Sequence, residues 1–230
     1  MNLRRIFPNV NRLIGLVGLS LAGTTLIRAL RKIRPKESIH IVGPPDAGKT
    51  TLFRYLRHKP RPDEAAKSLL RPRAGRIVSD LAGTKAYFFL SLAPDDVAGG
   101  ERARRARLIN KYNPDGVIFI IDTHNPEEEH VYLQELYDTY RDFSTQSKQV
   151  KLKVLLILLN KFDLWGNTAA SRDALMNRYR HEIFHDLINR FRSSFGVTVQ
   201  FGYASLTQAE HAPYNNVVLR DFLVALEQRG

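Results

Sequence analysis

The chain has 230 residues, no cysteine and a formal net charge of +12. Its length suits one domain with an appendage, and the lack of cysteine excludes a disulfide framework and a thiolate metal site. The charge is concentrated at the start of the chain, because residues 1–36 carry eight Lys and Arg and no Asp or Glu. We therefore expect a basic, hydrophobic tail of residues 1–36 and a globular domain of residues 37–230.

Within the tail, residues 13–27 form an uncharged apolar run. As a helix this run covers about 22 Å, short of the ~30 Å hydrocarbon core, whereas residues 6–30 approach spanning length. Its apolar side chains point in nearly every direction of a helical projection, which favours immersion in lipid. More basic residues follow the run than precede it, which places the globular domain in the cytoplasm. A membrane anchor is our first interpretation, and a helix packed on protein is the alternative.

Residues 43–50 read G-x-x-x-x-G-K-T, between an apolar run at residues 39–42 and a helical pattern. A strand, a tight turn and a helix in this order form a phosphate-binding loop, in which N–H groups at the helix N-terminus hold phosphate oxygens. We expect Lys49 to reach the β- and γ-phosphates and Thr50 to bind Mg²⁺. The other residues expected to bind nucleotide here are Gly43, Pro45, Asp46, Ala47, Gly48 and Thr51. The alternative is a chance match in an ordinary strand, turn and helix.

Two strand patterns follow, at residues 76–81 and 86–92, with a predicted hairpin turn between them. The second strand leads to Asp96-Val97-Ala98-Gly99, a D-x-x-G pattern. Beyond a phosphate-binding loop, Asp96 is expected to hold Mg²⁺ and the Gly99 N–H to meet the γ-phosphate. Taken alone, D-x-x-G is more often a simple turn, and that is the alternative here.

The most discriminating pattern is Asn160-Lys161-Phe162-Asp163, which follows the apolar run of residues 154–159. Guanine presents two adjacent N–H groups that the Asp163 carboxylate can accept together, whereas adenine has no such pair. We expect Asn160 to support the base and the loop, and the stem of Lys161 to pack over the ring. The sequence therefore predicts that the nucleotide is GTP or GDP.

Helical and strand patterns alternate along the rest of the chain. A helix over about 126–143 begins with Glu127–Glu129, which we interpret as acidic residues at the positive end of the helix dipole. A helical segment over about 168–192, a strand at 197–201 and a closing helix complete the alternation. The prediction is an α/β fold in three layers, with a mainly parallel six-stranded sheet containing one antiparallel strand, preceded by an N-terminal hydrophobic helix. All the motifs fall at strand carboxyl ends, where ligands bind in such sheets.

With these three motifs in order, the chain resembles a Ras-like small GTPase with a P-loop G domain. Residues 96–100, a basic helix and residues 116–122 resemble the ADP-ribosylation-factor branch. An apolar segment ahead of the domain is similar to the β subunit of the signal-recognition-particle receptor. The resemblance covers about residues 37–230 and implies a Mg²⁺-dependent GTPase. It also implies that a last base-contacting loop contains Ala204, Ser205 and Leu206, where the family usually has Ser-Ala in place of Ala204-Ser205.

Two departures from the family pattern concern hydrolysis. The family has a switch Thr that binds Mg²⁺, but no Thr lies between Thr51 and Thr84 here, and only Ser68 and Ser79 offer aliphatic hydroxyls. The family's water-positioning Gln is replaced by Gly100, with Glu101 next to it. Because glycine has no side chain to orient water, we expect slow hydrolysis unless a partner or Glu101 supplies the missing group.

Three functions remain open at this point. The first is a membrane-associated GTP/GDP switch that recruits or regulates a protein partner at its switch face. The second is a subunit that holds guanine nucleotide as a structural ligand without hydrolysing it. The third is a GTPase associated with RNA or the ribosome, because residues 54–76 hold eight basic residues against two acidic ones. We place nucleic acid last, since the sequence shows neither an RNA-binding motif nor aromatic residues interleaved with the charge.

Overall fold

The computed structural model describes residues 37–56, 75–81, 84–92, 107, 109–146, 148–165 and 168–228. The chain divides into two compact units, Met1–Lys36 and Glu37–Gly230, and the description below concerns the second. The hydrophobic helix predicted for the tail lies outside the described residues. Among the helices that are described, none combines the length and the apolar character needed to cross a membrane.

A parallel sheet forms the centre of the second unit. Its neighbouring parallel strands are β1 (Glu37–Val42), β4 (Gly116–Ile121), β5 (Val154–Leu159) and β6 (Thr198–Tyr203). On the other side of β1, backbone pairing adds β3 (Thr84–Leu92), parallel to β1, and then β2 (Gly75–Leu81), antiparallel to β3. The strand order is β2-β3-β1-β4-β5-β6. The predicted α/β fold with a parallel sheet is confirmed.

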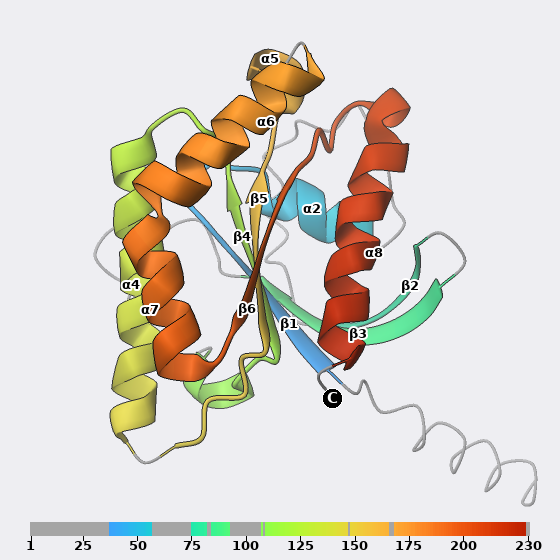
Figure 1. Ribbon diagram of the computed structural model, residues 1–230. Helices are drawn as coiled ribbons and strands as arrows, with labels where there is room; N and C mark the ends of the chain where they lie inside the picture. The colour runs from blue at the N-terminus through green and yellow to red at the C-terminus, as the bar shows by residue number, and fades with distance from the viewer. Residues whose placement is uncertain are drawn as a thin grey trace, which may run out of the picture. The chain divides into compact units, whose positions relative to one another are not determined.

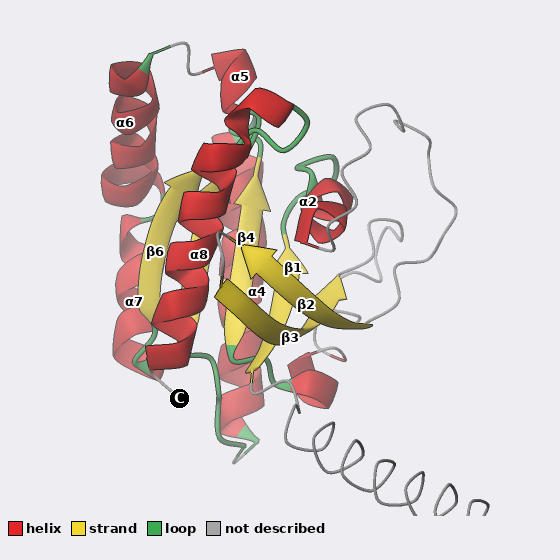
Figure 2. Ribbon diagram, turned by 90° about the vertical axis from the view of Figure 1, so that its right-hand side faces the viewer, coloured by secondary structure: helices red, strands yellow, loops and turns green. Residues whose placement is uncertain are grey.

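Helices cover both faces of this sheet (Figures 1 and 2). One face packs against α2 (Lys49–Leu56) and α8 (Ala212–Gln228), and the other against α4 (Pro126–Thr145) and α7 (His185–Phe195). Strand β4 shows how this follows from its sequence. Ile118 and Ile120 join the core under α2 and α8, while Val117, Phe119 and Ile121 join the core under α4 and α7. Because successive side chains point to opposite faces, a strand covered on both sides is apolar throughout.

The helical segment predicted over about 168–192 is interrupted in the structure. It consists of α6 (Ala169–Arg178), a π-helical turn η2 (Tyr179–Ile183) and then α7. The Phe184 N–H donates to the Tyr179 carbonyl oxygen at 2.9 Å, an i to i+5 hydrogen bond. Residues five apart in a regular α-helix face well away from each other, yet both rings are fully buried with centroids 5.3 Å apart. A π-turn contains one residue more than an α-helical turn. This extra residue brings Tyr179 and Phe184 to the same side, so both rings stay in the core.

A close approach of β6 to α8 gives a test of this packing. A Cβ atom built at Gly202 would collide with the side chain of Val218. We expect Gly202→Ala to lower the free energy of unfolding by about 1–3 kcal/mol, the usual range for overpacking a core contact. Urea unfolding would measure this, and the double variant with Val218→Ala should be more stable than Gly202→Ala alone. An unchanged midpoint in the single variant would contradict the assigned contact.

Candidate functional site

The loop after β1 has the backbone geometry expected of a phosphate-binding loop. It contains three residues with positive φ, which are Gly43 at 154°, Asp46 at 55° and Gly48 at 100°. A Cβ atom at Gly43 would collide with the backbone oxygen of Ile120, so only glycine lets the loop approach β4 this closely. Helix α2 begins immediately afterwards at Lys49. The strand, tight loop and helix inferred from the motif are therefore all present.

The Lys49 side chain folds back over this loop. It is 2% exposed, and its Nζ donates to the carbonyl oxygens of Gly43, at 2.8 Å, and Pro44. Thr50 and Thr51 are half-buried in the first turn of α2, while Pro45 and Asp46 are exposed at the loop tip. The ammonium group thus lies at the centre of the loop, where backbone N–H groups at the start of a helix attract anions.

A second motif contacts this loop from the end of β5. The Asn160 side-chain amide donates from Nδ2 to the Ala47 carbonyl oxygen at 2.9 Å. A Cβ atom at Gly48 would collide with the same Nδ2 atom. Asn160 is itself 4% exposed. The structure therefore brings together the two loops predicted to hold the phosphates and the base, although Ala47 and Asn160 are 113 positions apart in the chain.

Three polar atoms of this region are buried without a hydrogen-bond partner. They are Asn160 Oδ1, Asp163 Oδ1 and Ser205 Oγ. Buried polar atoms are normally paired, because leaving one unpaired costs about 1–3 kcal/mol. Unpaired groups gathered at the ends of β5 and β6 are therefore suited to a polar ligand. A carboxylate oxygen among them matches the N–H groups of guanine.

Backbone groups of the loop after β6 add to this arrangement. The Ala204 N–H donates to the Leu159 oxygen at 2.8 Å, and the Ser205 N–H donates to Asn215 Oδ1 at 3.0 Å. Asn215, on α8, returns a bond from Nδ2 to the Ser205 oxygen at 2.8 Å. The N–H groups of Ala204 and Ser205 are thus both engaged within the protein.

Lys161 of the N-K-x-D motif has an unusual backbone conformation, and its side chain forms an ion pair. Its φ is +60°, and its Nζ lies 3.1 Å from Asp122 Oδ2, just beyond the end of β4. Burial by itself would raise the pKa of Asp122. The hydrogen bonds from Lys161 and from the His124 backbone N–H outweigh it, so the pKa lies below its ordinary value. Asp122 is therefore a carboxylate that anchors the Lys161 ammonium.

The interpretation of Glu127–Glu129 as a simple acidic cap is wrong for the third residue. Asn125 caps α4 by accepting from the Glu128 N–H at 3.3 Å, and Glu127 and Glu128 are exposed. Glu129, however, is 1% exposed and accepts a 2.6 Å hydrogen bond from the Tyr179 hydroxyl. Its position four residues before Leu133, on the buried face of the helix, was the signal that helical spacing offered.

An aromatic cluster packs around Phe162 in the N-K-x-D loop, which is the loop predicted to bind the base. No sequence pattern indicated this cluster. The Phe162 ring packs on Tyr203 and His211, with centroids 5.5 Å and 4.5 Å away, and the Arg172 guanidinium lies 4.9 Å from its centroid. The Trp165 indole N–H donates to the Asn160 carbonyl oxygen at 2.8 Å. These contacts fix the backbone of residues 160–165 beside the three unpaired atoms.

Part of the predicted site lies outside the described residues. This part includes Asp96 and Gly99 of the D-x-x-G pattern, as well as Gly100 and Glu101. The structure therefore locates the predicted phosphate and base loops, and it describes one of the two predicted Mg²⁺ ligands, Thr50.

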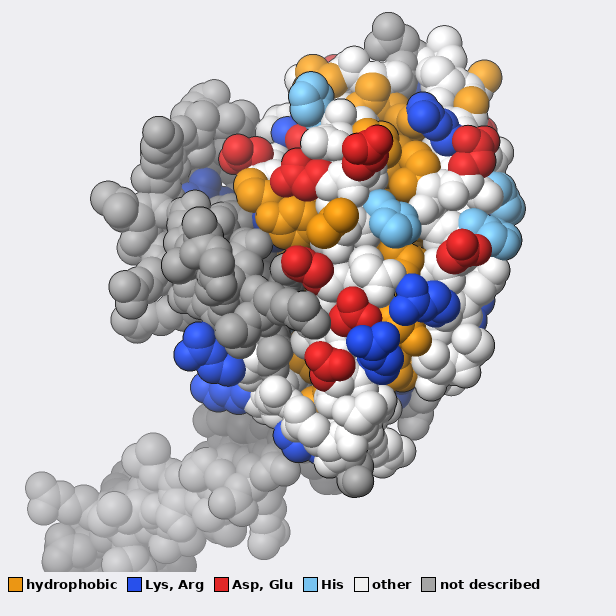
Figure 3. Space-filling model, turned by 90° about the vertical axis from the view of Figure 1, so that its left-hand side faces the viewer, with side chains coloured by type: hydrophobic (Ala, Val, Ile, Leu, Met, Phe, Trp, Pro, Cys, Tyr) orange, Lys and Arg blue, Asp and Glu red, His pale blue; other side chains and the backbone are white. Residues whose placement is uncertain are grey.

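One further motif match carries no site. His181-Glu182-Ile183-Phe184-His185 has the H-E-x-x-H spacing of helical zinc sites. Both histidines are exposed, and the pair straddles the junction between η2 and α7, where His185 contacts Asn189 at 3.0 Å. The face over α4 and α7 carries histidine side chains interspersed with acidic and basic ones (Figure 3). Within the described residues, no three His, Asp or Glu side chains gather into a group that could hold a metal.

Family comparison agrees with this geometry. The model of the ADP-ribosylation factor family matches residues 23–183, which include the phosphate loop, the D-x-x-G pattern and the N-K-x-D motif. The chain belongs to the ADP-ribosylation factor family. The resemblance inferred from the sequence is thus confirmed, and this ADP-ribosylation factor family member has a G-domain fold. No curated protein sequence matches the chain.

Solved structures of GTP-binding proteins are similar to this family member. A GTP-binding protein from the archaeon Sulfolobus solfataricus, solved in complex with GDP, aligns with 96% of the chain at 19% identity and a TM-score of 0.51. The chain spans 62% of that protein's length. The small COPII coat GTPase SAR1 from Encephalitozoon cuniculi, also with GDP, aligns at 19% identity and a TM-score of 0.48, covering 96% of this chain and 95% of its own. Likeness at these identities concerns the fold alone.

The contact between the two loops can be tested by its energetics. Asn160→Ala would leave the Ala47 carbonyl oxygen buried without its donor. We expect the free energy of unfolding of the nucleotide-free chain to fall by about 1–3 kcal/mol. Denaturant unfolding would measure it, with the exposed Asn189→Ala as the matched control, expected within about 0.5 kcal/mol of the wild type. Equal effects of the two substitutions would contradict the assigned role of Asn160.

Proposed function

We propose that this ADP-ribosylation factor family member is a small GTPase that alternates between GTP and GDP states and thereby recruits or regulates a protein partner. The observation that carries the proposal is the convergence of a phosphate-binding loop with unpaired buried acceptors at the N-K-x-D loop. The similar archaeal protein was solved with GDP, which supports guanine nucleotide as the ligand class.

In this proposal, each part of the site has a separate task. The backbone N–H groups of residues 43–50 and the Lys49 ammonium bind the phosphates, once Lys49 exchanges its carbonyl partners for phosphate oxygens. Asp163 accepts from the N–H groups of guanine, and the Leu206 N–H donates to its oxygen. Asn160 keeps the base loop attached to the phosphate loop.

A divalent metal completes the proposed site. The Thr50 hydroxyl lies in the first turn of α2, directly after Lys49, and an oxygen ligand of this kind suits Mg²⁺. Asp96 is the second proposed ligand, directly or through water. When bound, Mg²⁺ would neutralise charge on the β- and γ-phosphates during attack by water.

Hydrolysis by the chain alone is proposed to be slow. Gly100 stands where the family has a water-positioning Gln, and the switch Thr is missing. Glu101 is the residue of this chain that could orient water in place of the Gln. The same two departures favour a second candidate function, in which the chain holds GDP or GTP as a structural ligand without turnover.

Location at a membrane is also part of the proposal. The apolar run at residues 13–27 and its basic flanks support an anchor through residues 6–30, with the G domain in the cytoplasm. Such an anchor would bring a partner that binds the G domain to the membrane. The proposed partner is a protein, and nucleic acid is not part of the proposal.

The guanine assignment is tested by Asp163→Asn in the full-length chain. Replacing the carboxylate removes a charged acceptor, so we expect the affinity for GDP to fall about 10-fold to 150-fold. Competition of GTP and ATP against fluorescent GDP would measure this, with the exposed Asp173→Asn as control. Binding of ATP as tight as that of GTP, unchanged by Asp163→Asn, would overturn the guanine assignment.

The two candidate functions are separated by single-turnover hydrolysis of GTP with Mg²⁺. For a switch we expect slow but measurable hydrolysis and exchange, and a further loss in Glu101→Ala because a water-orienting group is removed. Bound nucleotide that neither exchanges nor hydrolyses would favour the structural-ligand function. Removal of Mg²⁺ by a chelator should accelerate nucleotide release in either case.

A further inference from the structure

A buried carboxyl group lies next to the base loop, and the proposed catalytic and binding roles do not use it. Glu129 enters the core from the first turn of α4 and accepts from the Tyr179 hydroxyl through Oε2. Its other oxygen, Oε1, is buried and receives no hydrogen bond. An acceptor left in this state is costly, and a bound proton would turn it into a donor.

Asp122 is the group that would accept the hydrogen bond from a protonated Glu129. Asp122 is close enough to Glu129 for its charge to raise the pKa of Glu129. Asp122 itself uses Oδ2 to pair with Lys161 and Oδ1 to accept from the His124 N–H. If both carboxyls were ionised, neither could donate to the other, and the buried charge of Glu129 would lie near the negative charge of Asp122. A proton on Glu129 supplies the missing hydrogen-bond donor and removes one of the two negative charges.

We propose that Glu129 is a positioning residue for the guanine-base loop: in its protonated form it donates a hydrogen bond to Asp122 and so holds Asp122 in place to pair with Lys161. The chain of contacts runs from the Tyr179 hydroxyl through Glu129 and Asp122 to the Lys161 ammonium. It connects the π-helical turn before α7 with the N-K-x-D loop. This inference rests on the proposed binding of guanine nucleotide, in which the stem of Lys161 is expected to pack over the guanine ring.

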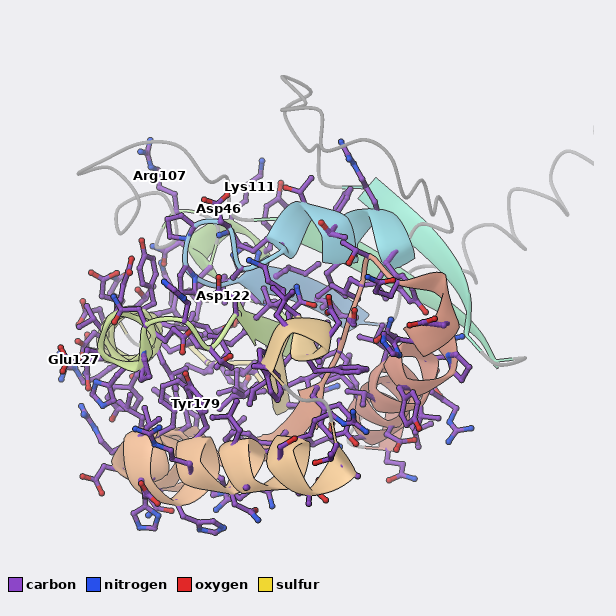
Figure 4. All side chains as sticks on the ribbon, turned by 90° about the horizontal axis from the view of Figure 1, so that it is seen from above. Asp46, Arg107, Lys111, Asp122, Glu127 and Tyr179 are labelled. Atoms are coloured by element: carbon purple, nitrogen blue, oxygen red, sulfur yellow. The ribbon has the colours of Figure 1, made fainter. Side chains whose placement is uncertain are left out.

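Figure 4 shows two members of this arrangement, Asp122 and Tyr179, from above the strand carboxyl ends. In that view Asp122 lies between the loop that carries Asp46 and the helical segment that carries Tyr179, while Glu127 lies at the outer edge. The titratable groups that act on Glu129 are Asp122, after β4, and Tyr179, before α7. Lys161, after β5, acts in turn on Asp122, and Arg178 acts on Tyr179.

The electrostatics place the loss of this proton near neutral pH. The pKa of Glu129 is raised from 4.5 to about 7. Burial is the largest cause and the Asp122 charge adds to it, while the hydrogen bonds from the Tyr179 hydroxyl and the Thr123 backbone oppose them. The folded chain therefore keeps the proton at pH values where the unfolded chain has released it. Its stabilising effect is complete below about pH 4.5 and is lost as the pH rises through about 7.

The test compares GDP dissociation from the full-length wild type, Glu129→Gln and Glu127→Gln. A Gln amide donates to Asp122 at every pH, as protonated Glu129 does. We expect wild-type dissociation to accelerate about fivefold or more from about pH 6 to about pH 8, in the range of measured couplings between sites. Glu129→Gln should stay slow at both pH values, whereas Glu127→Gln, on the exposed face, should behave as the wild type.

A further variant checks the sign of the effect. Tyr179→Phe removes a hydrogen bond that favours the ionised carboxylate, so the midpoint of the pH profile should move to higher pH. Wild-type dissociation that does not change with pH would overturn the proposal. So would a pH dependence that Glu129→Gln retains unchanged, because a purely structural contact predicts that result.

The proposed function and this inference fail in different ways. If neither the wild type nor Glu127→Gln binds GDP at any pH, the proposed function is wrong, and unfolding decides the inference. Between about pH 5 and about pH 7.5 the wild type should then lose stability relative to Glu129→Gln, because Gln carries no proton to lose. Parallel stability curves of the two chains over that range would overturn the proton on Glu129.

Discussion

The hydrogen bond from the Asn160 amide to the Ala47 carbonyl is the contact on which the site depends. It joins the loop after β1 to the loop after β5, which contain the predicted phosphate-binding and base-binding residues. Gly48 is needed there because a side chain would occupy the space of the amide. A ligand that binds both loops must match their separation, which this hydrogen bond constrains. The backbone carbonyl oxygen of Asn160 also accepts a hydrogen bond from the Trp165 indole, so both the side chain and the backbone of Asn160 are held.

The parallel sheet makes this contact available. Every residue of β4 and β5 is buried, and the two strands pair in register from Gly116 with Val154 to Ile121 with Leu159. Strands held in this way end at one edge, so the polar residues that follow them meet there. Burial of apolar side chains on both faces, at about 25 cal/mol per Å² of apolar surface, supplies the stability that a polar, partly unpaired edge does not.

Glu129 shows how a polar group can be accommodated inside this framework. Burial disfavours its charge, while the Tyr179 hydroxyl provides one hydrogen bond and Asp122 can accept another. The π-turn that begins at Tyr179 is part of the same solution, because it carries both Tyr179 and Phe184 into the core. Burial, protonation and the ion pair of Lys161 thereby meet in one group of side chains.

The sequence by itself determined the elements and the motifs. The apolar run of residues 154–159 coincides with β5, and the G-x-x-x-x-G-K-T and N-K-x-D patterns placed their residues at strand ends. These features depend on neighbours along the chain and on period-two or helical spacing, which a sequence displays directly. Only the tertiary structure decided that Glu129 is buried, that the segment before α7 contains a π-turn, and that Lys161 pairs with Asp122. Each of these depends on contacts between residues far apart in the chain, where burial and the nearby charges set both conformation and protonation.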